Sequence, residues 1–168
     1  MSEVRIAGAD EGDAVLDALT LAFASDPCTR YLLATPQAFL TAFRDFASGM
    51  GAGSVEAGAA WLAADGGAGA LWLPPGASSD RARMMGAAGP WILPERAETL
   101  GAVGEQMAAF HPEEPHWYLA MIGVDPARQG RGLGSALLKA ALRVVDESGM
   151  PAYLESSNPR NTPLYERF

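Results

Sequence analysis

A glycine-rich segment at residues 129–135 carries the residue types that bind phosphate. In order it reads Gln129, Gly130, Arg131, Gly132, Leu133, Gly134 and Ser135. Apolar residues at helical spacing follow, so a helix should begin there. A helix start leaves about four backbone N–H groups unpaired, and no side chain that normally caps a helix stands just before this one. Free amides, the helix dipole and the charges of Arg128 and Arg131 would attract an anion, which predicts a phosphate or pyrophosphate site at Gly130–Ser135.

Other motifs that bind phosphate or activate a serine fit this segment less well. A P-loop needs Gly-Lys followed by Ser or Thr, and the chain has no such triplet. The dinucleotide-binding fingerprint requires a third glycine at the position that Ser135 occupies, so the match is incomplete. Glu155 does resemble the acidic residue with which that fold binds the ribose. A nucleophile elbow is excluded because Ser135 is followed by Ala136 and Leu137. A glycine-rich surface turn with solvated arginines is the remaining structural interpretation.

The glycine-rich segment must be positioned by a strand before it and a helix after it. The run 117–124 is rich in aromatic and branched residues and predicts a buried strand, which Pro126 should end. Beyond the glycines, apolar residues recur at helical spacing until Gly149 and Pro151, a typical order for the end of a helix. A short second strand is then expected at 151–155.

The stretch from Ile122 to Leu138 closely resembles the acyl-CoA-binding motif of the GNAT superfamily of N-acyltransferases. The family signature is Gln or Arg, two residues, Gly, one residue, then Gly or Ala; it falls on Gln129, Gly132 and Gly134. Asn158, followed seven residues later by Tyr165, is similar to the family's last-helix motif. The two blocks cover 117–168, roughly the last third of the chain, and this part also loosely resembles puromycin N-acetyltransferases.

The resemblance implies acetyl-CoA (coenzyme A) as co-substrate and no metal. In the family the central strand opens and its backbone pairs with the pantetheine arm, a role that maps onto Ile122, Gly123 and Val124. The pyrophosphate would lie on Gln129–Ser135, and Asn158 would contact the pantetheine arm or cap a helix, or do both. Two histidines and one cysteine with no ligand spacing likewise give no sign of a metal site.

The same resemblance suggests the groups that move protons. Tyr165 would be the general acid that protonates the leaving thiolate, against the alternative of an aromatic that packs the last helix. The general base is left open: Glu155 is the first choice, Tyr118 stands where several relatives carry a carboxylate, and His116 is the third candidate. Acceptor binding in this fold uses the first two helices and their connection, so a further set of candidates is Phe23, Asp26, Cys28 and Tyr31.

The element order predicts an α/β (α+β) fold, a mixed, mostly antiparallel twisted sheet of the GNAT type flanked by helices. Strands are expected near 3–7, 55–57, 60–64, 68–73, 117–124 and 151–155, and the main helices near 13–23, 36–46, 94–110 and 133–148. Residues 1–168 should form a single acyl-CoA N-acyltransferase domain. The chain stops at Phe168, where relatives continue into two more strands, so we expect those strands to be absent.

Composition limits the classes of partner and compartment. Hydrophobic residues make up 49% and charged residues 19%, as in folded globular chains. A net charge of −8 argues against nucleic acid and favours a cationic substrate. A lone cysteine, charged residues at the N-terminus and the lack of a run of about 18 apolar residues predict a cytoplasmic protein without a membrane span. A homodimer is a compatible assembly.

These observations leave three functions to weigh. The first is direct transfer of an acetyl group from acetyl-CoA to the amine of a small molecule. The second is a non-catalytic acyl-CoA-binding sensor or pseudoenzyme that keeps Gln129–Ser135 but lacks a working acid or base. The third is a nucleotide-binding domain that prefers NAD to CoA.

Overall fold

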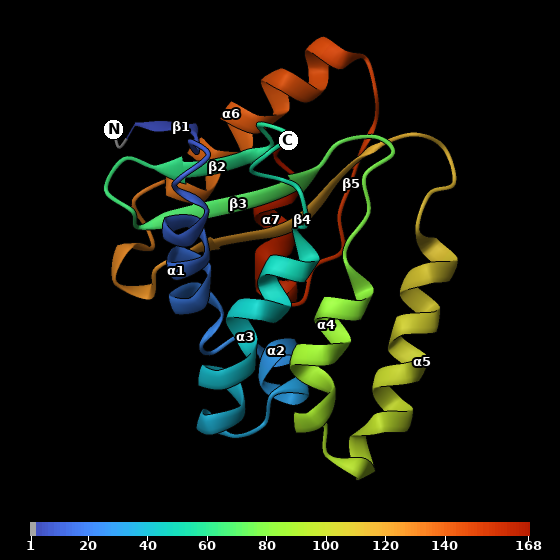
Figure 1. Ribbon diagram of the computed structural model, residues 1–168. Helices are drawn as coiled ribbons and strands as arrows, with labels where there is room; N and C mark the ends of the chain where they lie inside the picture. The colour runs from blue at the N-terminus through green and yellow to red at the C-terminus, as the bar shows by residue number, and fades with distance from the viewer. Residues whose placement is uncertain (1–2) are drawn as a thin grey trace.

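The computed structural model describes residues 3–168 and contains one five-stranded sheet (Figure 1). Its strands are β1 (Val4–Ile6), β2 (Ala60–Ala63), β3 (Ala68–Leu73), β4 (Trp117–Val124) and β5 (Ala152–Tyr153). They lie in chain order, and every neighbouring pair is antiparallel except β4 and β5, which are parallel. The predicted mixed, mostly antiparallel sheet is confirmed.

Helices cover both faces of this sheet. They are α1 (Gly12–Phe23), α2 (Pro27–Leu32), α3 (Pro36–Met50), α4 (Arg81–Ala88), α5 (Pro94–Phe110), α6 (Leu133–Ser148) and α7 (Thr162–Tyr165). Three short 3-10 turns are η1 (Gly89–Trp91), η2 (Pro126–Arg128) and η3 (Pro159–Asn161). Thr35 caps α3 by accepting the Ala38 amide at 3.1 Å, as expected for a threonine directly before a helix with Pro at its first position.

The sheet separates two apolar cores. Helices α1 and α3 pack on one face, and α6 packs on the other (Figure 1). The first core includes Val15, Leu19, Phe39, Phe43, Leu62 and Leu71, and the second includes Trp61, Trp72, Leu119, Leu137 and Leu138. Neighbouring residues of β2 and β3 thus face opposite cores, as the pleat requires. Helix α5 buries no residue and stands apart from the sheet in Figure 1.

A β-bulge in the central strand β4 changes which face of the sheet its side chains point to. Trp72 pairs with Leu119 and Leu71 pairs with Met121, so Ala120 is an extra residue without an opposite partner. Because side chains alternate along a strand, one extra residue reverses which positions point to each face. Leu119 accordingly packs in the α6 core, and Met121 packs in the α1 and α3 core.

The parallel strands β4 and β5 pair over only two positions. Trp117 pairs with Ala152 and Tyr118 with Tyr153, and the strands then separate. Within residues 3–168, the rest of β4 has no strand on its β5 side. An open sheet edge therefore runs from Leu119 to Val124, directly before the turn that leads into α6.

One local prediction was wrong, and one helix was not predicted. The strand expected at 55–57 is a turn, because Gly53 and Gly58 adopt positive φ and the chain folds back there; buried Ser54 then donates to the Trp72 carbonyl at 2.8 Å. Helix α2 was not predicted, although its cap is a typical one: Asp26 accepts the Thr29 amide at 2.8 Å. Within the described chain, no helix has the length and apolar character needed to cross a bilayer.

Gly123 gives the first testable prediction, because α1 packs against its α-carbon. A Cβ there would lie 2.5 Å from Cβ of Ala22 and 3.3 Å from Leu19. We expect Gly123→Ala to lower the free energy of unfolding by about 1–3 kcal/mol through overpacking, measured by denaturant titration. Gly101→Ala in exposed α5, where a Cβ meets nothing within 4 Å, is the matched control and should be neutral or slightly stabilising. Equal stabilities of the two variants would contradict the packing account.

Candidate active site

The start of α6 is built from glycines in the left-handed region. Gly130 has a φ of 75° and Gly132, the residue before the helix, a φ of 81°. A side chain in this conformation costs roughly 1–2 kcal/mol, which is why glycine stands at both positions. No side chain caps the helix, as predicted. The turn before it is closed by Asp125, which accepts the Ala127 amide at 2.9 Å.

The amides at this helix start have no acceptor in the protein. Among the hydrogen bonds that residues 3–168 make with one another, none is donated by the backbone N–H groups of 130–135. The first amide of the helix to be paired belongs to Ala136, which donates to the Gly132 carbonyl at 3.0 Å. Leu133 itself is buried in the α6 core, so it can offer a ligand only its backbone. Unpaired amides at a helix N-terminus are the kind of backbone surface that attracts anions.

The charges around this turn differ from the expectation in one respect. The guanidinium of Arg128 pairs with Asp65 in the β2–β3 turn at 2.5 Å, so this arginine is already neutralised by a carboxylate. Arg131 forms no ion pair within the described chain and bonds only the Ala127 carbonyl, at 3.5 Å. Of the two arginines at this turn, Arg131 is therefore the one whose charge is available to a bound anion.

The glycine turn lies next to the open edge of β4. The side-chain amide of Gln129 donates to the carbonyl of Val124 at 3.2 Å, which ties the turn to the end of the strand. A Cβ on Gly134 would meet Leu164 at 3.4 Å and Val124 at 3.8 Å. The start of α6, the end of β4 and α7 therefore converge. On the β5 side, the backbone of Ile122, Gly123 and Val124 pairs with no strand within residues 3–168.

Two predicted site residues, Asn158 and Tyr165, lie near the end of the chain, before and in α7. The side-chain oxygen Oδ1 of Asn158 accepts the Arg160 amide at 3.1 Å, so the expected capping role is present. Tyr165 packs at the margin of the α6 core. Burial, followed by the negative charge of Asp26, raises the pKa of the Tyr165 phenol. Asp26 is itself buried and accepts the hydroxyl of Ser157 at 2.6 Å, a link that sequence patterns gave no sign of.

Glu155 lies in a separate group of side chains at the point where β4 and β5 part. Its Oε1 is 3.6 Å from Nδ1 of His111, and its Oε2 is buried without a hydrogen-bond partner within residues 3–168. Burial, followed by the charge of Glu155, raises the pKa of Tyr118. Burial and the same carboxylate also raise the pKa of Tyr153. Glu155 is thus a charged group that three aromatic side chains surround.

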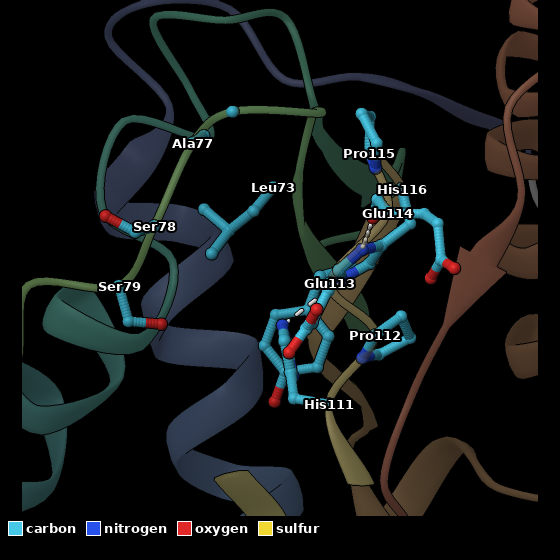
Figure 2. A pocket seen from close by; sticks show the side chains of 12 residues that line it. Leu73, Ala77, Ser78, Ser79, His111, Pro112, Glu113, Glu114, Pro115 and His116 are labelled. Carbon is cyan, nitrogen blue, oxygen red and sulfur yellow. Dashed lines mark hydrogen bonds between the residues drawn. The ribbon is translucent and has the colours of Figure 1, made fainter. Parts of the chain in front are cut away.

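A cavity of about 410 Å³ opens beside this group (Figure 2). One wall is Leu73 at the end of β3 and the loop after it, with Ser78 and Ser79, and the other is the proline-rich loop before β4. Tyr118 and both histidines line it as well. Its size is in the range of small-molecule sites. Glu155 and Tyr165, the two predicted proton-transfer residues, belong to different groups of contacts: Glu155 lies with His111, and Tyr165 lies near Asp26.

His111 is the residue that sequence reasoning missed. Only His116 was considered, yet the two rings meet at 4.8 Å between centroids and His111 is the one that reaches Glu155. The available signal was that the only two histidines of the chain flank a loop holding Pro112 and Pro115. In residues 3–168 no cluster of three or more histidine, cysteine, aspartate or glutamate side chains could hold a metal ion.

Comparison with known proteins gives one family match and several relatives. The model of the acetyltransferase (GNAT) family matches residues 61–168. An uncharacterised N-acetyltransferase of Schizosaccharomyces pombe is 31% identical over 110 residues, which are 58% of this chain and 44% of that protein. A mycothiol acetyltransferase of Streptomyces scabiei is 32% identical over 120 residues, 67% of this chain and 39% of the relative. The chain therefore spans less than half the length of these curated relatives.

Solved structures agree on the fold. A structure described as histone acetyltransferase HPA2 and related acetyltransferase, from Corynebacterium glutamicum, has a TM-score of 0.68 and 28% identity and covers 99% of this chain and 83% of that one. A polyamine N-acetyltransferase of Drosophila melanogaster has a TM-score of 0.63 at 19% identity, covers 99% of this chain and 81% of its own, and supports the fold alone.

Tyr118 provides a test of the charge on Glu155. Because that carboxylate raises the pKa of Tyr118 beyond the effect of burial, Glu155→Gln should lower the Tyr118 pKa toward the ordinary tyrosine value. A pH titration of tyrosinate absorbance, with Tyr118→Phe to assign the signal, measures the shift. Glu113→Gln, which removes an exposed carboxylate from the same cavity, is the control and should leave the titration unchanged. A Tyr118 titration that Glu155→Gln does not move would contradict the described cluster.

Proposed function

The chain belongs to the acetyltransferase (GNAT) family, and we propose that it transfers the acetyl group of acetyl-CoA directly to the amine of a small molecule. The observation that carries this proposal is the junction of two unsatisfied backbone surfaces: the unpaired amides at the start of α6 and the open edge of β4. The first suits a diphosphate, and the second suits an extended, amide-containing arm. Relatives named N-acetyltransferase and mycothiol acetyltransferase support acetyl transfer.

In this proposal acetyl-CoA binds from the α6 side. The pyrophosphate accepts hydrogen bonds from the amides of 130–135, with Gln129 and Arg131 beside it. The pantetheine arm lies along Ile122, Gly123 and Val124 as an added strand, and Asn158 contacts the arm from the other side. Residues 3–168 then act as one acyl-CoA N-acyltransferase domain.

Catalysis needs the thioester and the amine held together, an acid and a base. Positioning alone can supply about 7–11 kcal/mol. Tyr165 is the proposed acid: its raised pKa keeps the phenol protonated through neutral pH, so it can donate a proton to the leaving thiolate. Glu155 is the proposed base, because its buried Oε2 has an open acceptor position beside a cavity of small-molecule size. The amine would enter through that cavity as a cation drawn by the net charge of −8.

Gly130 offers a test of the anion site that leaves the fold unchanged. Its positive φ and open surroundings accept either Asn or Asp, which tolerate this conformation. We expect Gly130→Asp to weaken acetyl-CoA binding about fivefold or more relative to Gly130→Asn, since a negative charge near the phosphates repels them by about 1 kcal/mol or more. Calorimetric titration measures both constants, and the difference should narrow in high salt. Equal affinities of the two variants would contradict a diphosphate at this turn.

Tyr165 tests the chemical step. Thiol release from acetyl-CoA is measured with a panel of amines, and Tyr165→Phe should lower kcat by about 10²-fold while the affinity for acetyl-CoA stays the same. Phe110→Leu, which changes an exposed aromatic side chain of α5, is the control and should keep the wild-type kcat. Acetyl-CoA binding without turnover on any amine would favour the non-catalytic acyl-CoA sensor instead. A fully active Tyr165→Phe enzyme would remove Tyr165 from the mechanism.

A further inference from the structure

The two histidines and Glu155 form one continuous chain of polar contacts. Nδ1 of His111 lies 3.6 Å from Oε1 of Glu155, and Nε2 of His111 lies 3.2 Å from Nε2 of His116. At the far end, Nδ1 of His116 lies 2.7 Å from the backbone carbonyl oxygen of Glu114. Figure 2 shows the two rings and these last two contacts on one wall of the cavity.

This geometry determines where the protons of both rings lie. A carbonyl oxygen can only accept, so His116 must carry its proton on Nδ1 and, when neutral, has a lone pair on Nε2. That lone pair accepts from His111, which must therefore carry a proton on its own Nε2. The nitrogen of His111 left to gain or lose a proton is Nδ1, and this is the atom that faces Glu155.

We propose that His111 relays the proton from Glu155 to solvent and that His116 is the positioning residue that fixes the tautomer of His111. The proposal rests on the proposed function, because it takes Glu155 as the base. It extends that function to two residues that hold a proton path rather than touch the acetyl group.

The proton balance has three steps. The N–H bond of the acceptor ammonium breaks, and its proton joins the carboxylate of Glu155, which leaves the neutral amine to attack the thioester. The proton then moves from the carboxyl oxygen to Nδ1 of His111, so the imidazole becomes an imidazolium beside a restored carboxylate. His111, whose side chain is 39% exposed, finally gives one proton to water in the cavity. One proton enters and one leaves in each turnover.

His111 offers the more exposed route to solvent, since its side chain is 39% exposed and that of Glu155 is 20% exposed. Oε2 of Glu155 is buried, and Tyr118 of β4 and Tyr153 of β5 lie against His111 at ring distances of 5.0 and 5.2 Å. Both phenols have raised pKa values and stay neutral, so they do not compete for the proton. The other titratable groups at the cavity are Glu113 and Glu114, both exposed and on the same loop as His116. The facing loop contributes Ser78 and Ser79, which do not titrate.

The first experiment reads the tautomers without any turnover. Nitrogen-15 NMR of the histidine rings in the whole protein should show His116 protonated on Nδ1 and His111 protonated on Nε2 at neutral and mildly alkaline pH. His116→Phe keeps an aromatic ring against Tyr153 but removes the acceptor, so His111 should then populate both tautomers. A His116 ring protonated on Nε2, or a His111 tautomer that His116→Phe leaves unchanged, would overturn the proposal.

The second experiment reads the path in catalysis. His111→Asn keeps a donor for His116 but cannot take up a proton, and kcat should fall about 10²-fold with an unchanged acetyl-CoA KM. Its pH–rate profile should differ from that of the wild type, because the group that takes up the proton from Glu155 is gone. His116→Phe should lower kcat about tenfold. Full activity and an unchanged profile in His111→Asn would overturn the relay.

The two experiments separate this proposal from the one on which it rests. Glu105→Gln, which removes an exposed carboxylate of α5 that does not line the cavity, is the control and should keep the wild-type kcat and profile. If the wild-type chain binds acetyl-CoA but acetylates no amine, the proposed function fails, and the relay fails with it as a catalytic path even where the tautomers agree. If the wild-type chain is active and His111→Asn is equally active, only the relay fails.

Discussion

The feature on which the rest of the structure depends is the short parallel pairing of β4 with β5. Two residue pairs hold the strands together, and beyond Tyr118 the edge of β4 has no neighbouring strand in residues 3–168. An unpaired strand edge offers backbone donors and acceptors that water or a ligand must satisfy. The amides at the start of α6 have the same requirement and lie beside it. Two local defects in backbone pairing thus produce one site.

The central strand is adapted to this gap by features that a regular strand lacks. The bulge at Ala120 lets Leu119 and Met121 enter opposite cores, so both faces stay packed although the strand edge is open. Gly123 has no side chain because α1 occupies that space. The glycine therefore has a packing reason that is independent of any cofactor. Packing on both faces holds the open edge in position without a partner strand.

Where the strands part, residues from three segments meet. The histidines come from the loop before β4, and Tyr118 is the second residue of β4. Tyr153 is the last residue of β5, and Glu155 follows two residues later. β4 and β5 are parallel and pair at only two positions, so the loop before β4 lies close to β5 only where the two strands pair. The proposed base is held at this end, and the proposed acid Tyr165 lies across the opening near α6. Acceptor and cofactor would thus approach the gap from different sides.

Local order along the chain was sufficient for most of the elements and for the uncapped glycine turn before α6. The glycine spacing, the absence of a capping side chain before α6 and the stop at Gly149 follow from backbone sterics and helix periodicity within a few residues, and the structure has each of them. Only the tertiary contacts determined the other features. Arg128 forms an ion pair with Asp65, and residues 55–57 form a turn instead of a strand. The bulge at Ala120 changes which face of the sheet the β4 side chains point to, and His111 lies beside Glu155. Each of these depends on the register or approach of segments distant in the chain, which local propensity and periodicity do not encode.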